Sequence, residues 1–155
     1  MRNIELVQLL ISKNYKISCA ESCTGGMLAS SIVEVADASK VLDMSFVTYA
    51  SEAKISLINV NKDTIDKNGV VSEDVAKEMA IGVANKANSN VGVGITGLAG
   101  PSGGTELKPV GMVCIGICIN KKTYTFTQYF GNIGRTLVRQ KTVEFVIDRL
   151  IELLE

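Results

Sequence analysis

The segment from Ser18 to Gly26 gathers hydroxyls, thiols, a carboxylate and two glycines within nine residues. Such a segment has the composition of a reaction site, because Ser22 and Cys23 are possible nucleophiles and glycine lets a backbone approach a ligand closely. The chain of 155 residues contains no histidine, so the commonest general base of enzymes is absent. A serine nucleophile here needs a lysine, a carboxylate or a tyrosine to accept its proton.

Lys54 is the best candidate for this base. It follows Tyr49, near the end of a strand-like segment, by five positions, and a lysine removed from water at a pocket wall has a lowered pKa. Tyr49 is suited to orient a substrate or donate a hydrogen bond. From the residues alone, Ser22, Ser39 and Cys23 all stay open as the nucleophile, and a solvated surface lysine is the alternative for Lys54.

A glycine-rich loop offers a second chemical feature, since successive backbone amides bind anions. The loop runs from Thr96 to Gly104, includes Gly97, Gly100 and Gly103, and is followed by Lys108. It has neither the Gly-Lys-Ser/Thr of a Walker A loop nor the G-x-G-x-x-G spacing of a dinucleotide site. We expect it to contact a phosphate; taken alone, however, a glycine-rich turn is more often a structural connector, because turns require positive φ angles.

Two predicted helix starts also favour anion binding. Thr24 and Gly25 open a helix whose first amides lack partners, so they either bind an anion or are simply capped. Arg135 and Arg139 lie four residues apart, on one face of the last helix. Arginine at a helix start opposes the helix dipole, which suggests that the pair grips a phosphate or carboxylate rather than stabilising the helix.

The overall composition restricts the possible partners. Sixteen basic and sixteen acidic residues cancel, so no global field attracts nucleic acid or an anionic membrane. The length predicts one domain over residues 1–155. The first residues lack the pattern of a cleaved signal peptide, and we expect a cytoplasmic protein.

The four cysteines form two C-x3-C pairs, which could suggest a metal site. Cys114 and Cys118 fall in an apolar run that reads as a strand, where positions four apart are about 13 Å from each other. One zinc ion cannot bind both. We therefore expect buried free thiols and no metal, with Cys19 and Cys23 less certain because they flank the reaction segment.

Helical and strand patterns alternate along the first two thirds of the chain. Helices are expected over 3–13, 24–35, from 51, 72–88 and 134–155, and strands over 16–20, 41–49, 91–95, 110–119 and 123–130. Residues 59–69 read as irregular. The fold class is therefore α/β, a three-layer α/β/α sandwich around a mixed, mostly parallel sheet. Ligands bind at the carboxyl ends of strands in such sheets, so the segments 21–26, 49–54 and 96–104 are expected to converge on one pocket.

Several motifs of the chain match a known pattern. The chain reads AESCTGG at 20–26, FVTY with EAK between 46 and 54, GVVS at 69–72, and TGLAGP, GGTE and KPVG between 96 and 111. These motifs, in this order, resemble the C-terminal domain of the CinA competence/damage-inducible proteins, the nicotinamide-nucleotide amidase family. The resemblance covers nearly the whole chain.

The resemblance implies hydrolysis of the carboxamide of nicotinamide mononucleotide to nicotinate mononucleotide and ammonia, without metal or organic cofactor, by a homodimer. It implies a serine and lysine mechanism that involves Ser39 with Lys54, Ser22, and Tyr49 with Arg135 or Arg139.

The chain departs from the family pattern in two places. The usual Gly-Ser-Ser reads Asp37-Ala38-Ser39, and the usual Gly-Asp-Arg reads Gly131-Asn132-Ile133-Gly134-Arg135. These departures keep open an inactive nucleotide-binding or competence-related interaction module. A separate alternative is an amidase that uses Cys23 as its nucleophile, as other amide-cleaving enzymes do.

Overall fold

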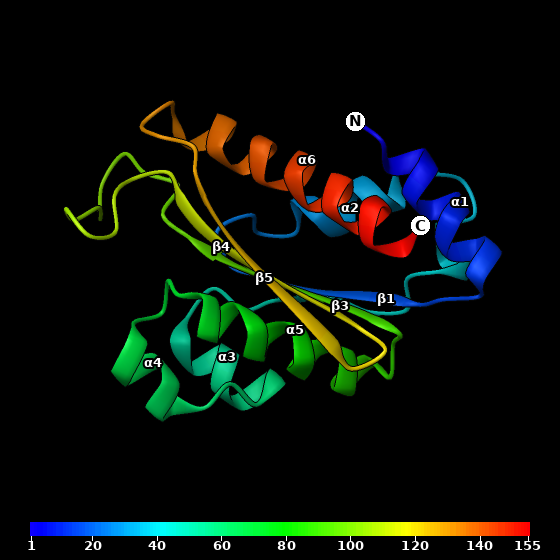
Figure 1. Ribbon diagram of the computed structural model, residues 1–155, viewed down its shortest axis with the longest axis horizontal. Coiled ribbons are helices and arrows are strands. Elements are labelled where there is room, and N and C mark those ends of the chain that lie inside the picture. Colours follow the sequence, from blue (N-terminus) through cyan, green and yellow to red (C-terminus); the bar gives the residue numbers. More distant parts are fainter.

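The computed structural model describes residues 1–155 and is built on a five-stranded sheet of order β2-β1-β3-β4-β5 (Figure 1). The strands are β1 (Ile17–Glu21), β2 (Phe46–Val47), β3 (Val91–Gly97), β4 (Met112–Ile119) and β5 (Lys122–Tyr129). β1 pairs in parallel with β2 and β3, whereas β3–β4 and β4–β5 are antiparallel. The mixed α/β fold is confirmed, but half of the pairings are antiparallel, so "mostly parallel" overstated the parallel share.

Helices cover both faces of this sheet. α1 (Asn3–Lys13), α2 (Met27–Val33) and α6 (Arg135–Leu154) lie on one face, and α3 (Ser51–Ile58), α4 (Lys62–Asn68) and α5 (Glu73–Ala87) lie on the other (Figure 1). The larger apolar core packs α1, α2 and α6 against the sheet, and a smaller one joins α3 and α5 to it. None of the helices combines the length and apolar character that a membrane span requires.

Two elements differ from the sequence prediction. The polar stretch 59–69, expected to be irregular, contains α4, because Asn61 caps this helix by accepting a hydrogen bond from the amide of Asp63 at 2.8 Å. The strand expected over 41–49 shrinks to β2, with a single bridge between Ile17 and Leu42 before it. Because this edge strand is short, the residues after Val47 can turn toward the carboxyl end of β1, here called the active region.

The connections after β1, β2 and β3 lie at one end of the sheet, at the left in Figure 1. β1 and β3 run side by side in the same direction, with Glu21 paired to Ile95, and Glu21 also pairs with Val47 of β2. This register brings together the chain segments that begin at Ser22, Thr48 and Thr96. The predicted convergence at the carboxyl ends of the strands follows from it.

Candidate active site

Lys54 lies at the centre of a buried polar cluster at this end of the sheet. Its side chain is fully buried, and Nζ donates hydrogen bonds to Ser22 Oγ at 3.0 Å, to the Thr48 carbonyl at 2.7 Å and to the Tyr49 carbonyl at 3.2 Å. A charged lysine has three N–H donors, and all three have acceptors here. Lys54 is therefore no solvated surface group, and it lies within reach of one candidate nucleophile.

The local chain path explains how a lysine comes to lie in the interior. The Thr48 amide donates to the Glu21 carbonyl at 2.9 Å, which continues the pairing of β2 with β1 by one residue. α3 begins at Ser51 and directs Lys54, in its first turn, back toward that end of β2. Burial lowers the pKa of Lys54 from its ordinary value of 10.5 to about 8. An appreciable fraction of the amine is thus neutral near pH 7.

The two carbonyls set the direction in which a neutral Lys54 can act. A carbonyl oxygen only accepts hydrogen bonds, so Thr48 and Tyr49 hold the two hydrogens of the neutral amine. The lone pair then faces the remaining partner, Ser22 Oγ. In the charged form the Ser22 hydroxyl instead donates toward the Tyr49 carbonyl, at 3.4 Å. The cluster can therefore accept a proton from Ser22 and return it.

Glu21, which the sequence analysis did not single out, frees Ser22 for this role. Its buried carboxylate accepts hydrogen bonds from Thr24 Oγ1 at 2.7 Å and from the amides of Leu28 and Ala29 at 2.9 and 3.0 Å. Glu21 therefore caps α2, which begins at Met27 rather than at Thr24. The helix start is already occupied by a carboxylate, so of the two alternatives left open there the structure shows capping, and the Thr24 hydroxyl is not free for substrate.

The turn between Ser22 and α2 supplies donors close to the nucleophile. Gly25 and Gly26 have φ angles of 57° and 99°, a left-handed conformation that suits glycine. The Ser22 amide is held by the Ile95 carbonyl at 3.0 Å, whereas the amides of Cys23 and Thr24 donate to no other residue. The amide that follows a nucleophile is a common stabiliser of developing negative charge.

Both arginines predicted to bind substrate lie at this cluster. Arg139 donates from Nε to the Cys23 carbonyl at 3.0 Å and from NH2 to the Thr24 carbonyl at 2.9 Å. Arg135 donates to the Gly100 carbonyl and to the Tyr49 hydroxyl, both at 2.8 Å. Neither forms a salt bridge with a carboxylate. The surface around the cluster, here called the mouth, therefore carries the two unpaired positive charges of Arg135 and Arg139.

Packing accounts for several residues of the glycine-rich loop. A Cβ added to Gly97, Gly100 or Gly104 would lie within 3.0 Å of atoms in residues 110–113, where the chain returns from the loop and enters β4. Thr96 is buried, and its hydroxyl donates to the Val70 carbonyl at 3.0 Å. The loop is therefore packed closely against residues 110–113. The Thr96 hydroxyl is used within the chain and is not free to bind a ligand.

Lys108 also differs from its expected role. Its Nζ donates to the carbonyls of Asn68 and Val71, at 2.7 and 2.6 Å, which holds the loop against the α4–α5 connection. The exposed amides of Ser102, Gly103 and Gly104 donate to no group of the chain. Any phosphate contact of this loop therefore depends on its backbone and not on Lys108.

Ser39 lies at the opposite end of the sheet, and the implied Ser39–Lys54 pair does not form. Ser39 is exposed in a short 3-10 helix, Ala38–Lys40. The carbonyl of Val41, which follows this helix, accepts a hydrogen bond from the amide of Ile17, the first residue of β1. Ser22 follows the last residue of β1. At roughly 3.3 Å per residue, the length of β1 separates the two serines by about 15 Å.

Cys23 is buried, and burial raises the pKa of its thiol to about 11. A protonated thiol is a poor nucleophile, so the geometry favours Ser22 over its neighbour. Cys114 and Cys118 are free, buried thiols as predicted, and so is Cys19.

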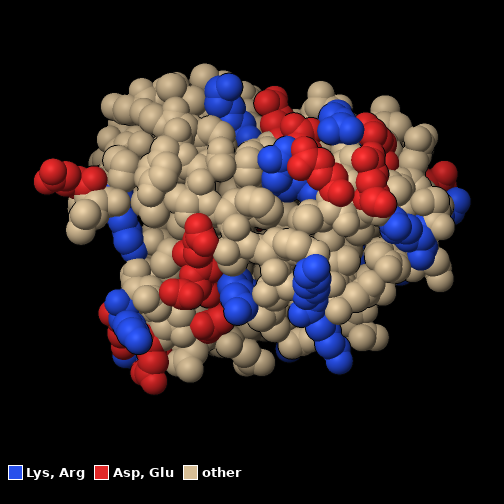
Figure 2. All heavy atoms as spheres, viewed as in Figure 1, with Lys and Arg blue, Asp and Glu red and all other residues tan.

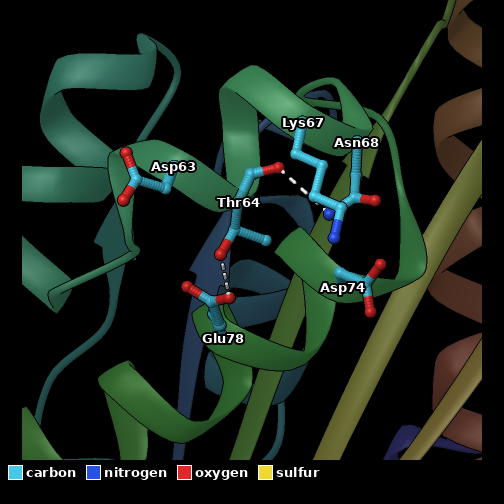
Figure 3. Close-up of a pocket in the computed structure, with 6 residues that line it drawn as sticks. All are labelled: Asp63, Thr64, Lys67, Asn68, Asp74 and Glu78. Carbon is cyan, nitrogen blue, oxygen red and sulfur yellow. Dashed lines mark hydrogen bonds between the residues drawn. The ribbon is translucent and has the colours of Figure 1, made fainter.

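The largest surface pocket lies elsewhere and has different chemistry. It has a volume of about 350 Å³ and lies between α4 and α5, lined by Asp63, Thr64, Lys67, Asn68, Asp74 and Glu78 (Figure 3). Thr64 Oγ1 donates to Glu78 at 2.6 Å, and Asn68 donates to the Thr64 carbonyl at 3.2 Å. The hydroxyl of this pocket is hydrogen-bonded to a carboxylate, and no lysine amine contacts it as Lys54 contacts Ser22. None of the four pockets is lined by Ser22 or Lys54, so Ser22, 9% exposed, meets a shallow surface while Lys54 stays buried beneath it.

The lowered pKa of Lys54 predicts the pH dependence of any reaction that uses it as the base. The active form is the neutral amine, so kcat/KM should rise with pH through about 8 and then level off. A pH–rate profile between about pH 6 and about pH 10 checks this prediction. A rise that continues toward 10.5, the value of a solvated lysine, would show that Lys54 is not the buried base.

The chain is similar to proteins of one family over nearly its whole length. Residues 2–154 match the family model described as the CinA C-terminal domain. A CinA-like protein of Fervidobacterium nodosum is 44% identical over 147 residues, which cover 92% of this chain and 35% of that protein. The chain thus spans about a third of the length of the curated relatives that it matches.

Two solved structures share the whole fold. The competence/damage inducible protein CihA of Agrobacterium tumefaciens is 36% identical with a TM-score of 0.93, and the match covers 100% of this chain and 97% of that one. A competence or damage-inducible protein of Enterobacter asburiae is 29% identical with a TM-score of 0.95, and covers 99% and 96%.

Proposed function

The chain belongs to the family of the CinA C-terminal domain, and from this premise we propose that it hydrolyses the carboxamide of nicotinamide mononucleotide to nicotinate mononucleotide and ammonia. One observation carries the proposal. The fully buried Lys54 has two of its hydrogens on backbone carbonyls and Ser22 Oγ at 3.0 Å on its third side. This arrangement is suited to activate a serine in a chain that has no histidine.

The reaction runs in two halves. Neutral Lys54 takes the Ser22 proton as Oγ attacks the amide carbon, and the free amides of Cys23 and Thr24 stabilise the oxyanion. Lys54 then gives this proton to the departing nitrogen, which leaves as ammonia, and an ester on Ser22 remains. Water, deprotonated by Lys54, attacks this ester, and the proton returns to Ser22 Oγ as the carboxylic acid leaves. No step calls for a metal or an organic cofactor.

The charge at the mouth supports a phosphorylated substrate. Arg139 uses two of its donors on the Cys23 and Thr24 carbonyls, and its remaining N–H groups are available next to Gly25. A guanidinium held in this way is suited to bind phosphate oxygens. The free amides of Ser102, Gly103 and Gly104 add donors from the loop that Arg135 ties to Tyr49. We place the reaction in pyridine nucleotide salvage in the cytoplasm, carried out by a homodimer.

An ammonia-release assay tests the proposed function. The purified chain is incubated with nicotinamide mononucleotide and, separately, with free nicotinamide, which carries the same amide without ribose and phosphate. We expect turnover of the nucleotide and little turnover of the free base. Binding of the nucleotide in a calorimeter without ammonia release would instead support the inactive binding module.

Arg139 provides a separate prediction about substrate binding. Arg139→Gln keeps one amide donor, at about the position of Nε, but removes the charge, so KM for nicotinamide mononucleotide should rise by about tenfold to a hundredfold with a smaller change in kcat. Steady-state kinetics measure both constants. Gln140→Ala, at the exposed neighbouring position of α6, is the control and should leave both unchanged. An unchanged KM in Arg139→Gln would remove Arg139 from the phosphate site.

A further inference from the structure

The end of the molecule that holds the Ser22–Lys54 cluster is also its most apolar exposed surface. Six of the eleven exposed large apolar side chains lie here: Val47, Tyr49, Leu107, Tyr129, Ile133 and Leu137. In Figure 2 the surface over the start of α6 and the end of β5, at the upper left, is almost free of charged side chains. Exposed apolar side chains gathered at one end of a molecule are typical of an interaction surface.

The most exposed of these side chains is Leu107, at 88%. It belongs to residues 102–107, here called the arm, and this segment extends beyond the body of the molecule at the left in Figure 1. The tip is a closed turn, since the Thr105 amide donates to the Lys108 carbonyl at 2.8 Å and the Lys108 amide donates to Thr105 Oγ1 at 3.0 Å. Leu107 is therefore held outward by a defined turn.

The base of the arm keeps it away from the cluster of its own chain. Lys108 Nζ is bonded to the carbonyls of Asn68 and Val71 on the α4–α5 side. Folding the arm back over Ser22 would break both charge-assisted hydrogen bonds. At the same time the cluster lacks an enclosing wall, because no pocket of the chain includes Ser22 or Lys54. A nucleotide bound there would stay open to water.

We propose that a second copy of this chain docks on this end of the molecule and lays its arm over the Ser22–Lys54 cluster of the first. The two surfaces are complementary in charge. The arm carries Glu106 beside Leu107, and the mouth carries Arg135 beside Leu137; neither charge has a salt-bridge partner within the chain. The arm and the mouth lie at the same end of the molecule. In a two-fold symmetric dimer, the arm of each chain can therefore contact the mouth of the other.

The arm would complete the site in two ways. Leu107 covers the shallow opening and excludes water from the reacting atoms, which strengthens the electrostatic interactions within the cluster. Glu106 of the second copy pairs with Arg135, whose other donors already hold Gly100 and Tyr49. Arg139 is left for the phosphate. The active unit is then the pair of chains, with each site built from both.

Subunit complementation tests this inference, which rests on the proposed function only for its activity readout. Leu107→Asp places a charge in the apolar contact and should weaken dimerisation by about a hundredfold or more. Its activity should fall with it, although its Ser22–Lys54 pair is intact. Lys54→Ala is inactive but has an intact arm. An equal mixture of the two should recover activity at least about tenfold above the sum of the separate variants, because each mixed dimer contains one complete site.

Sedimentation velocity of the wild type, Leu107→Asp and the control Ile4→Asp supplies a readout independent of substrate. We expect dimers for the wild type and for the control, whose change lies at an exposed position of α1. We expect monomers for Leu107→Asp, with an unchanged circular dichroism spectrum. If this shift occurs in a chain that releases no ammonia, the interface is supported and the proposed function fails. A monomeric wild type, or an active wild type whose two variants give no recovery on mixing, overturns the inference.

Discussion

Lys54→Met should abolish ammonia release from nicotinamide mononucleotide, with kcat/KM reduced by about a thousandfold or more. Methionine has nearly the same length as lysine but accepts no proton, so Ser22 keeps its position and loses its base. The effect is expected to be this large because no histidine exists to take over the role, and Lys54 is the only side-chain amine hydrogen-bonded to Ser22. The assay is steady-state ammonia release near pH 8.

The same variant should stay folded. Replacing the amine leaves the Thr48 and Tyr49 carbonyls without a donor, while it removes the cost of keeping a charged group in the interior. These terms oppose each other, and we expect the free energy of unfolding near pH 7 to change by no more than about 2 kcal/mol. Urea unfolding measures it. Retained turnover in folded Lys54→Met would contradict the lysine-base mechanism.

Raising the pH should shift the stability difference between the two proteins in favour of the wild type. The pKa of Lys54 is about 8 in the folded chain and about 10.5 when unfolded, so between these values the unfolded state binds more protons. The stability of the wild type should therefore rise with pH in this window, relative to Lys54→Met. A stability difference between the two proteins that does not depend on pH would show that the lysine is not desolvated in the folded state.

Ser22→Ala should be as inactive as Lys54→Met, whereas Ser39→Ala should change kcat/KM by less than about twofold. Ser22 Oγ is the atom that Lys54 contacts, and its backbone amide remains held by Ile95 after the substitution. Ser39 is exposed at the other end of β1. The comparison is matched, since both changes remove one hydroxyl and add none.

Parallel ammonia-release assays on the two variants decide between the serines. Loss of activity in Ser39→Ala with activity kept in Ser22→Ala would restore the serine that the family resemblance implied. Loss in both would mean that Ser39 acts on the site of another chain, which the geometry of a single chain does not provide. Cys23→Ala belongs in the same series and should stay active, because its thiol is protonated.

Much of the fold was accessible from hydrophobic periodicity. The antiparallel pair β4 and β5, the helices α1, α5 and α6, and the strands that end at the active region all follow from apolar patterns that local sequence determines. α4 was missed because its residues are polar and its core contacts few, and only the Asn61 cap marks its start. The short β2 was overextended because the apolar residues Val41, Leu42 and Met44 precede its paired part, and Thr48 and Tyr49, which favour strands, follow it.

Only some residues of the site could be predicted from the sequence, and the physical reason differs from residue to residue. The absence of histidine pointed to Lys54 from composition alone. The choice between Ser22 and Ser39 depended on which end of β1 each serine occupies, and strand pairing, not local sequence, decides that. Glu21 was missed because a carboxylate inside a strand gives no sign that it will cap the following helix.

Peptide mapping by mass spectrometry, on protein quenched in acid during turnover of nicotinamide mononucleotide, identifies the residue that carries the covalent intermediate. We expect a nicotinate mononucleotide ester on Ser22, formed as ammonia leaves, and no such ester in Lys54→Met treated in the same way. An acyl group localised to Ser39 or Cys23, with Ser22 unmodified, would contradict this expectation.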